Sequence, residues 1–232
     1  MAQALAGQPA IFSYAGRVQA LAPQPLPVRV GGFGGIAGLV AYLQQAQITH
    51  VVDATHPFAA QISQHALAAC TQLQVPLLAF TRPPWRPQLG DQWQTVPDIA
   101  AAVAALSGPA QRIFLALGRL QLPHFVAQPQ HHYLLRLIEP LPEPIALPQQ
   151  QTVLARGPFV LADEHALLQA HGIERLVCKN SGGEGARAKL LAARALGLPI
   201  VMIDRPAPLP RPEVYSLQEA LAWLAHEANL GV

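Results

Sequence analysis

The most constraining feature of this 232-residue sequence is an alternation of short runs rich in β-branched and aromatic residues with longer runs rich in Ala and Leu. A parallel sheet requires such alternation, because each strand is joined to its parallel neighbour by a long crossover that is usually a helix. The expected strands are residues 11–14, 28–30, 50–53, 76–80, 112–117, 132–138, 152–154, 175–178 and 200–203. The expected helices, from their apolar spacing, are residues 36–45, 59–72, 98–106, 163–171, 186–196 and 217–228. The sequence therefore predicts the α/β class, with more than one sheet.

Pro-rich stretches interrupt this pattern at residues 82–87 and 140–148, and a Ser-Gly-Pro break begins between them at Ser107. Clusters of Pro and Gly end regular elements and mark loops and linkers. We expect the domain boundary near Ser107, with an N-terminal domain at residues 1–107 and a C-terminal domain at residues 108–232. A boundary in the second Pro-rich stretch is the alternative.

The first seven residues predict the tail of a helix that leads into the strand at residues 11–14. A doubly wound domain normally begins with a strand and a Gly-rich turn before its first helix. We therefore expect the first βα unit to be incomplete here, either because the start lies upstream of Met1 or because the unit has been lost. A missing central strand would leave an exposed apolar edge that can pair with another chain.

Composition excludes several classes of protein. Hydrophobic residues make up 51% of the chain and charged residues 12%, which predicts a folded protein with a large core. The formal net charge is only +2, so no nucleic acid is expected as a partner. The apolar runs are shorter than the about 20 residues that cross a bilayer, and no signal peptide is evident. We expect no membrane partner and a cytoplasmic location.

Metal binding is also not expected. The two cysteines, Cys70 and Cys178, lie far apart in apolar segments, which favours buried thiols over a disulfide or a thiolate metal site. The nine histidines lack the paired spacing of zinc ligands, and the adjacent His131 and His132 point to opposite faces of a strand.

Four glycines lie between a strand and a helix in residues 30–36, VGGFGGI. Glycine allows positive φ and close approach of the backbone, so exposed N–H groups can surround a phosphate at a helix N-terminus. Gly32, Phe33, Gly34 and Gly35 are therefore candidate cofactor-binding residues. A tight strand-to-helix turn explains the pattern equally well, because the regular GxGxxG spacing is absent.

A polar cluster follows the apolar strand in residues 51–59, VVDATHPFA. In open parallel sheets ligands bind beyond the carboxyl ends of the strands. Thr55, Pro57 and Phe58 are candidate cofactor-binding residues, and His56 is the candidate catalytic residue. The alternatives are that Thr55 caps the following helix and that His56 packs in the core.

A third strand end carries residues 177–184, VCKNSGGE. Lys179, Asn180 and Ser181 supply a charge and hydrogen-bond donors, while Gly182 and Gly183 open the backbone to an anion. Carboxylate or phosphate recognition is the expected role, with a solvated loop as the alternative. The segment is not a Walker loop, because its glycines follow the Lys.

Four arginines lie beside turn residues at expected strand ends, namely Arg17, Arg82, Arg119 and Arg156. Individually, each is compatible with a surface charge. Arg17 differs because the end of the second strand of a dinucleotide-binding fold is where an Arg accepts the 2′-phosphate of NADP. An acidic residue there would have indicated NAD.

Taken together and in this order, GGFGG, DATHPFA, RPPW, ARGPF, and KNSGG followed by AARALGLPIVMI resemble the precorrin-6A reductases. The resemblance covers residues 11–205, and DATHPFA and KNSGG are its most specific segments. It implies NADPH-dependent reduction of a double bond in precorrin-6A, which gives precorrin-6B in cobalamin biosynthesis. The anaerobic counterpart acts on a cobalt-containing substrate.

The resemblance also implies two Rossmann-like α/β domains with mainly parallel sheets and a cleft between them. NADPH would bind the N-terminal domain, with Arg17 near the 2′-phosphate. Lys179 to Gly183, assisted by Arg82, Arg119 and Arg156, would bind the carboxylates of the tetrapyrrole substrate. His56 would donate the proton, with solvent as its rival. Neighbouring enzymes of the cobalamin pathway are the candidate protein partners.

The chain departs from the family at its start, where a strand and a GGTxE-like loop usually precede the first helix. This departure leaves open a second hypothesis, a non-catalytic tetrapyrrole-binding or scaffold protein derived from such a reductase. An unrelated reductase of small carbonyl compounds is ranked last, because the sequence contains no Tyr-x-x-x-Lys pair.

Overall fold

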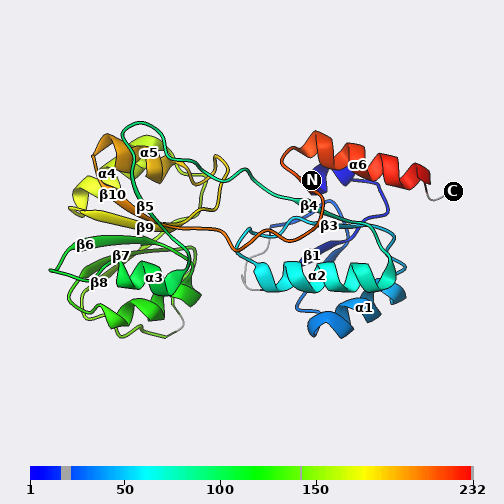
Figure 1. Cartoon of the computed structure of the whole chain (residues 1–232), viewed down its shortest axis with the longest axis horizontal. Helices are drawn as coiled ribbons and strands as arrows, with labels where there is room; N and C mark the ends of the chain where they lie inside the picture. The colour runs from blue at the N-terminus through cyan, green and yellow to red at the C-terminus, as the bar shows by residue number, and fades with distance from the viewer. Residues whose placement is uncertain (17–21, 142, 231–232) are drawn as a thin grey trace. The chain divides into compact units, whose positions relative to one another are not determined.

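The structure is a computed structural model that describes residues 1–16, 22–141 and 143–230. It divides into two compact units. Unit 1 is Met1–Thr81 together with Leu209–Val232, and unit 2 is Arg82–Pro208. In each unit, strands lie between layers of helices (Figure 1). Every strand pair of the described residues is parallel, so the predicted α/β class with mainly parallel sheets is confirmed.

Unit 2 is built on a six-stranded sheet with the order β5-β10-β9-β6-β7-β8. Its strands are β5 (Gln92–Val96), β6 (Arg112–Ala116), β7 (His132–Leu137), β8 (Gln150–Leu154), β9 (Arg175–Lys179) and β10 (Pro199–Ile203). Its helices are α3 (Ile99–Ala104), the 3-10 helix η2 (Arg119–Ala127), α4 (Leu161–Ala170) and α5 (Ala188–Ala195). In Figure 1, α4 and α5 lie on one face of the sheet and α3 on the other.

The sequence of each strand follows from its place in this sheet. Ile113 to Leu115 in β6 and Leu176 to Cys178 in β9 are fully buried, because helices cover both faces of a central parallel strand. The edge strands β5 and β8 instead read QWQTV and QQTVL, since their outer sides face solvent.

Unit 1 contains a three-stranded sheet with the order β11-β4-β3 and a two-stranded sheet of β1 and β2. Its strands are β1 (Phe12–Tyr14), β2 (Val28–Val30), β3 (Val51–Asp53), β4 (Leu77–Phe80) and β11 (Glu213–Val214). Its helices are the 3-10 helix η1 (Ala2–Leu5), α1 (Gly35–Gln45), α2 (Ala60–Leu73) and α6 (Leu217–Leu230). Figure 1 shows α1 and α2 on one side of the strands and α6 on the other.

Helix ends agree with the local sequence signals. The Asp98 carboxylate accepts a hydrogen bond of 2.8 Å from the Ala101 N–H and caps α3. Ser216 and Glu219 bond each other's backbone N–H groups before α6, which is a capping box. Gly172 and Gly197 have positive φ after α4 and α5, as expected for residues that follow a helix. The start of α4 was expected near Asp163 but lies at Leu161, with Asp163 in its first turn.

The division of the chain differs from the expected boundary near Ser107. Strand β5 pairs with β10 along its whole length, so residues 82–107 belong with the second unit. Strand β11 returns to pair with β4 of the first unit. The sequence did not indicate β5, β11 or η2, because β5 has an edge composition and β11 has only two residues. Both β5 and β11 are fixed by partners far away in the chain.

Among the described residues, no strand pairing joins the two sheets of unit 1. Within the described ranges, β1 pairs only with β2 and β3 pairs only with β4. Ile11, directly before β1, is 45% exposed, and Val28 and Val30 in β2 are 45% and 54% exposed. That the first βα unit is incomplete stays a prediction. Separately, none of the helices in the described residues is long and apolar enough to cross a bilayer.

Candidate functional site

The carboxyl edge of the unit 2 sheet gathers several of the predicted site residues. Strands β6, β9 and β10 are neighbours in a parallel sheet, so the segments that follow them leave from the same edge. These segments carry Arg119 after β6, Lys179 at the end of β9, and Arg205 after β10. Sequence analysis missed Arg205, although its position beyond a strand end and before Pro206 is the same signal that indicated the other arginines.

The loop of residues 179–183 is held by a segment almost a hundred residues away. The Trp85 N–H donates to Asn180 Oδ1 at 2.8 Å, and Asn180 Nδ2 donates to the Trp85 carbonyl at 3.1 Å. The indole Nε1 of Trp85 donates to the Gly183 carbonyl at 2.8 Å. The Asn180 side chain is buried and bonded through both its oxygen and its nitrogen, so it holds the loop against the segment that contains Trp85.

Arg205 fixes the same loop from a second direction. Its Nε donates to the Asn180 carbonyl at 2.9 Å and its Nη2 to the Ser181 carbonyl at 3.2 Å. In a trans peptide the N–H points opposite to the C=O, so the N–H groups of Gly182 and Glu184 turn away from Arg205 and Trp85. Within the part of the chain that the structure describes, nothing accepts a hydrogen bond from the N–H groups of residues 182–186.

Both glycines of this loop are required by close packing. A Cβ atom at Gly182 would lie 2.2 Å from the Pro83 carbonyl oxygen and 2.3 Å from Arg205 Nη2. A Cβ atom at Gly183 would lie 2.6 Å from Cδ of Arg82, and both glycines have positive φ. The glycines were expected to open the backbone to an anion, and the structure adds a different reason for them: the 82–85 segment lies directly against the loop.

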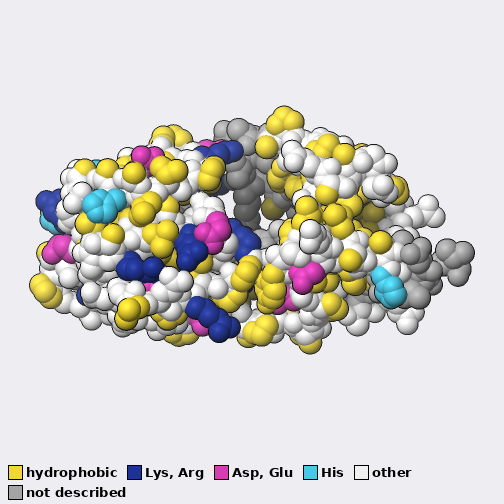
Figure 2. Space-filling view, turned by 90° about the horizontal axis from the view of Figure 1, so that it is seen from above, with side chains coloured by type: hydrophobic (Ala, Val, Ile, Leu, Met, Phe, Trp, Pro, Cys, Tyr) yellow, Lys and Arg dark blue, Asp and Glu magenta, His cyan; other side chains and the backbone are white. Residues whose placement is uncertain are grey.

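The positive charge of the protein is concentrated in unit 2. This unit contains twelve Lys and Arg residues against nine Asp and Glu residues, a formal net charge of +3, whereas unit 1 contains three against four. Figure 2 shows Lys and Arg side chains on the left part of the face that it draws, which belongs to unit 2. Arg82, Arg119 and Arg156 are all exposed. Arg156 follows the edge strand β8, two strands beyond β6, so it is the least central of the predicted cations.

The glycine-rich loop of unit 1 is organised by Arg29. Arg29 donates to the carbonyls of Gly31 at 2.6 Å and Gly32 at 2.7 Å, and its guanidinium lies 3.8 Å from the ring centroid of Phe33. Phe33 also packs against Tyr42 on α1, so its ring supports the loop. Gly34 is the N-cap of α1 with φ of 79°, a left-handed conformation that glycine adopts without strain. Gly32 and Gly34 are exposed at the N-terminal end of this helix.

The Asp53 carboxylate anchors the second candidate loop of unit 1. Oδ1 accepts hydrogen bonds from the N–H and hydroxyl of Thr55 at 3.0 and 2.6 Å. Oδ2 accepts one from the Ser63 hydroxyl at 2.6 Å and forms an ion pair with Arg211. Burial alone would raise the pKa of Asp53, but these hydrogen bonds outweigh it and lower the pKa below the usual value. Thr55 therefore bonds Asp53 and does not cap α2, whose N-cap is Ala59.

His56 is exposed, which contradicts the alternative of a packed core histidine. Its Nδ1 accepts a hydrogen bond of 3.2 Å from the Phe58 N–H, and the two rings lie 5.8 Å apart between centroids. Because Nδ1 acts as an acceptor, the neutral ring carries its proton on Nε2. Pro57 and Phe58 are half-buried in the same loop, directly before α2. Arg17 lies outside the described residues.

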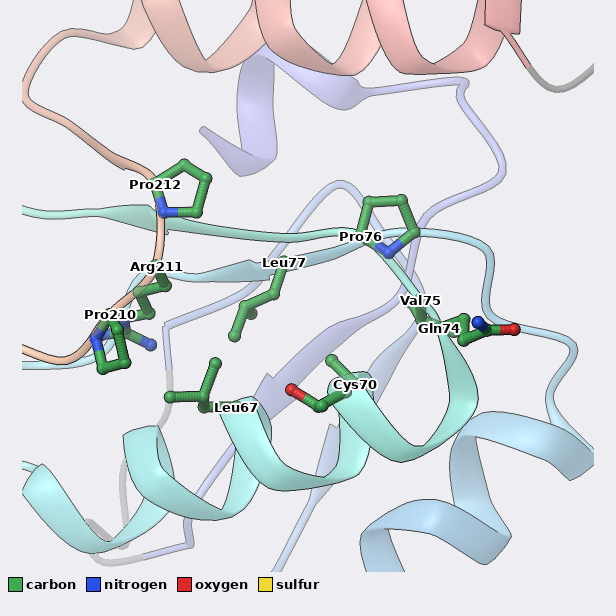
Figure 3. A pocket seen from close by; sticks show the side chains of 10 residues that line it. Leu67, Cys70, Gln74, Val75, Pro76, Leu77, Pro210, Arg211 and Pro212 are labelled. Carbon is green, nitrogen blue, oxygen red and sulfur yellow. The ribbon is translucent and has the colours of Figure 1, made fainter.

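A cavity of about 290 Å³ lies elsewhere in unit 1, between α2, the start of β4 and residues 210–212 (Figure 3). Cys70 lines it, and burial together with the nearby Asp53 charge raises the pKa of this thiol to about 11. The thiol therefore stays protonated at neutral pH. Among the described residues, none of those predicted for cofactor or substrate binding lines this cavity.

Comparison with known proteins identifies the family. The family model described as "Precorrin-6x reductase CbiJ/CobK" matches residues 1–225. A precorrin-6A reductase of Rhodobacter capsulatus is 54% identical over 227 residues, which cover 97% of this chain and 90% of that protein. A cobalt-precorrin-6A reductase of Synechocystis is 32% identical and covers 83% of this chain and 72% of that protein. The solved structure of a CobK precorrin-6A reductase superimposes with a TM-score of 0.93 at 54% identity, covering 97% of this chain and 91% of that one. The chain belongs to the precorrin-6x reductase family CbiJ/CobK.

Proposed function

We propose that this chain reduces one double bond of precorrin-6A to give precorrin-6B, with NADPH as the reductant. The main support is the family membership together with the Lys and Arg residues that follow the carboxyl ends of the strands in unit 2. A precorrin carries many carboxylate side chains, so an enzyme that binds it needs fixed cations and backbone donors. The relatives named for the metal-free substrate share more identity with this chain than the relative named for the cobalt form, which favours the metal-free substrate.

Unit 2 is the part that we assign to the macrocycle. Lys179 is half-buried at the end of β9, and burial lowers the pKa of its ammonium group. The N–H groups of residues 182–186 precede α5, whose first turn adds the positive end of a helix dipole. Arg82 and Arg119 are exposed cations of the same edge. These groups together suit carboxylates, and Arg156 is a secondary candidate.

Unit 1 is the part that we assign to NADPH. The loops before α1 and α2 both place a helix N-terminus after a parallel strand, the arrangement that receives phosphates in dinucleotide-binding folds. Unit 1 has three cationic side chains. Arg211 pairs with Asp53, and Arg29 bonds the glycine loop, so Arg17 is the candidate for the 2′-phosphate. The exposed Gly32 and Gly34, the half-buried Gly35 and the segment from Thr55 to Phe58 would frame the rest of the cofactor.

When bound, NADPH supplies the hydride. The chain has to align the acceptor carbon and the cofactor, exclude water and provide a proton. His56 is the candidate proton donor, because its ring is exposed and histidine is the side chain that most often acts as a general acid. Solvent is the competing donor. Neither route requires a covalent intermediate with the protein.

Titration of the protein with NADPH, followed by fluorescence, tests the cofactor assignment directly. We expect binding in the micromolar range, weaker binding of NADH, and about a 10-fold or larger loss of NADPH affinity in Arg17→Ala, because a charged hydrogen bond to phosphate contributes about 1.5 kcal/mol or more. Arg112→Ala, an exposed arginine at the amino end of β6, is the matched control. The folded protein should then convert precorrin-6A. No NADPH binding by folded protein would contradict the proposal and favour the non-catalytic alternative.

A further inference from the structure

Lys189 is a buried charge that the proposed function has not used. It is one of two lysines in the sequence, lies in α5, and is only 4% exposed. Within the described residues, no carboxylate oxygen lies within 4.0 Å of its Nζ. Its neighbours in the helix, Ala188 and Leu190, are buried apolar residues. An ammonium group at such a position is unusual, because lysine is almost never fully buried without an anionic partner.

The contacts of Lys189 lead directly to the loop that we assign to the substrate. Nζ donates to the Ala186 carbonyl at 2.6 Å and lies 4.7 Å from the ring centroid of Trp85. Trp85 in turn bonds Asn180 and the Gly183 carbonyl. Lys189 therefore makes two contacts near this loop. It bonds the Ala186 carbonyl, and it lies over the Trp85 ring, whose indole N–H bonds the Gly183 carbonyl.

Folding alone gives no reason for this charge. Burial lowers the pKa of Lys189, which means that the surroundings disfavour the charged form. The Glu164 carboxylate forms its ion pair with Arg136 through Oε1, and its charge favours the ammonium of Lys189 from more than 4.0 Å away, which does not offset the effect of burial. Replacing a buried charge by an apolar residue of similar volume is often neutral or stabilising. A methionine would fill the same space and could keep a contact with the indole ring.

We propose that Lys189 is a positioning residue for the reaction, which holds Trp85 and the Ala186 carbonyl so that the backbone N–H groups of residues 182–186 face the carboxylates of the substrate. The ammonium acts through the loop and does not touch the substrate. This inference rests on the proposed function, because it needs the loop of residues 179–183 and the turn that follows it, up to Ala186, to bind precorrin-6A.

Steady-state kinetics of Lys189→Met test this role, with both substrates varied and thermal unfolding measured in parallel. The expected result is about a 10-fold rise in KM for precorrin-6A, because one charge-assisted hydrogen bond that organises the loop is lost. The KM for NADPH and kcat should stay within about 2-fold, and Tm should be unchanged or higher. Lys189→Arg, which keeps the charge and a donor, should recover part of the affinity.

Leu190→Val is the matched control, since Leu190 is a buried neighbour in α5 that has no charge to lose. It should lower Tm by a few degrees and leave both KM values unchanged. A wild-type KM for precorrin-6A in Lys189→Met would overturn the inference, as would loss of folding, since the charge would then be needed for stability. Lys179→Ala separates the two proposals: if it raises this KM and Lys189→Met does not, only the inference fails. If neither variant changes KM, the assignment of the loop to the substrate fails as well.

Discussion

The loop at residues 53–58 in unit 1 and the loop at residues 179–183 in unit 2 occupy equivalent places, each after a parallel strand and before a helix. They are stabilised differently. The unit 2 loop is fixed along its backbone by Trp85 and Arg205. The unit 1 loop is anchored at its first residue, where Asp53 bonds Thr55, Ser63 and Arg211, while His56 lies exposed.

This difference suits two different tasks. A loop that binds several carboxylates benefits from a rigid backbone, because donors that are already in place lose no conformational entropy on binding. A loop that delivers a proton needs one accessible titratable side chain, and it is enough that the loop is anchored where it leaves the strand. We therefore expect substitutions in the unit 2 loop to act through stability and substrate affinity, and those beyond Asp53 in unit 1 to act on turnover.

Gly182→Ala should have the largest effect. The added Cβ would clash with the Pro83 carbonyl and with Arg205, at a residue with φ of +67°. We expect a loss of about 4 kcal/mol or more of the free energy of unfolding, measured by denaturant titration, and loss of precorrin-6A binding. Gly185→Ala, two residues beyond this loop, is the control, because no atom lies within 4 Å of the position of its Cβ. Equal stability of the two variants would refute the close packing described above.

Asp53→Asn should destabilise unit 1 by about 3 kcal/mol, because it leaves the largely buried Arg211 without its partner charge. The pKa of Asp53 is lowered in the folded protein, so its stabilising contribution is present above the ordinary pKa of 3.8 and is lost as the pH falls. Denaturant titrations at several pH values should therefore show the gap between wild type and variant widest near pH 7 and narrowing below about pH 4. A gap independent of pH would contradict this account of the loop's anchor.

His56→Ala should reduce kcat about 10-fold to 100-fold while the affinity for NADPH changes little, because it removes a proton donor and no phosphate contact. Stopped-flow turnover with precorrin-6A measures the effect. His65 on α2, in the same unit, provides the control substitution His65→Ala. Wild-type turnover of His56→Ala would leave solvent as the proton source.

Asp98→Ala should have the smallest effect on stability and none on kinetics. It shows how far a small loss of stability alone changes the kinetic constants. It removes the N-cap of α3 and should cost about 1 kcal/mol of stability. Asp98 is not part of either loop, so kcat and both KM values should remain those of the wild type. A change in either KM would mean that general destabilisation of unit 2 alone is enough to disturb substrate binding.

Much of the fold follows from local sequence. The alternation of strands and helices, including helices that begin near Asp98 and at Leu217, depends on residues close together in the chain and was predicted. Strand β5 was not, because QWQTV has the composition of an edge strand and pairs with β10 about a hundred residues later. The roles of Asn180, Arg205 and Arg211 were missed for the same reason: each depends on a contact with a distant segment. The positions of the two candidate loops could be predicted, but not how each is held.

The return of the chain to unit 1 has a consequence for protein synthesis. Unit 2 is one continuous stretch of the chain, so all of it can emerge from the ribosome before translation ends. Unit 1 stays incomplete until residues 209–217 and the helix after them have emerged, since β11 covers the edge of β4 and Arg211 neutralises Asp53. While the second unit is being translated, β4 lacks the strand that pairs with its edge and Asp53 lacks its cationic partner. Unit 1 is therefore begun first and completed last.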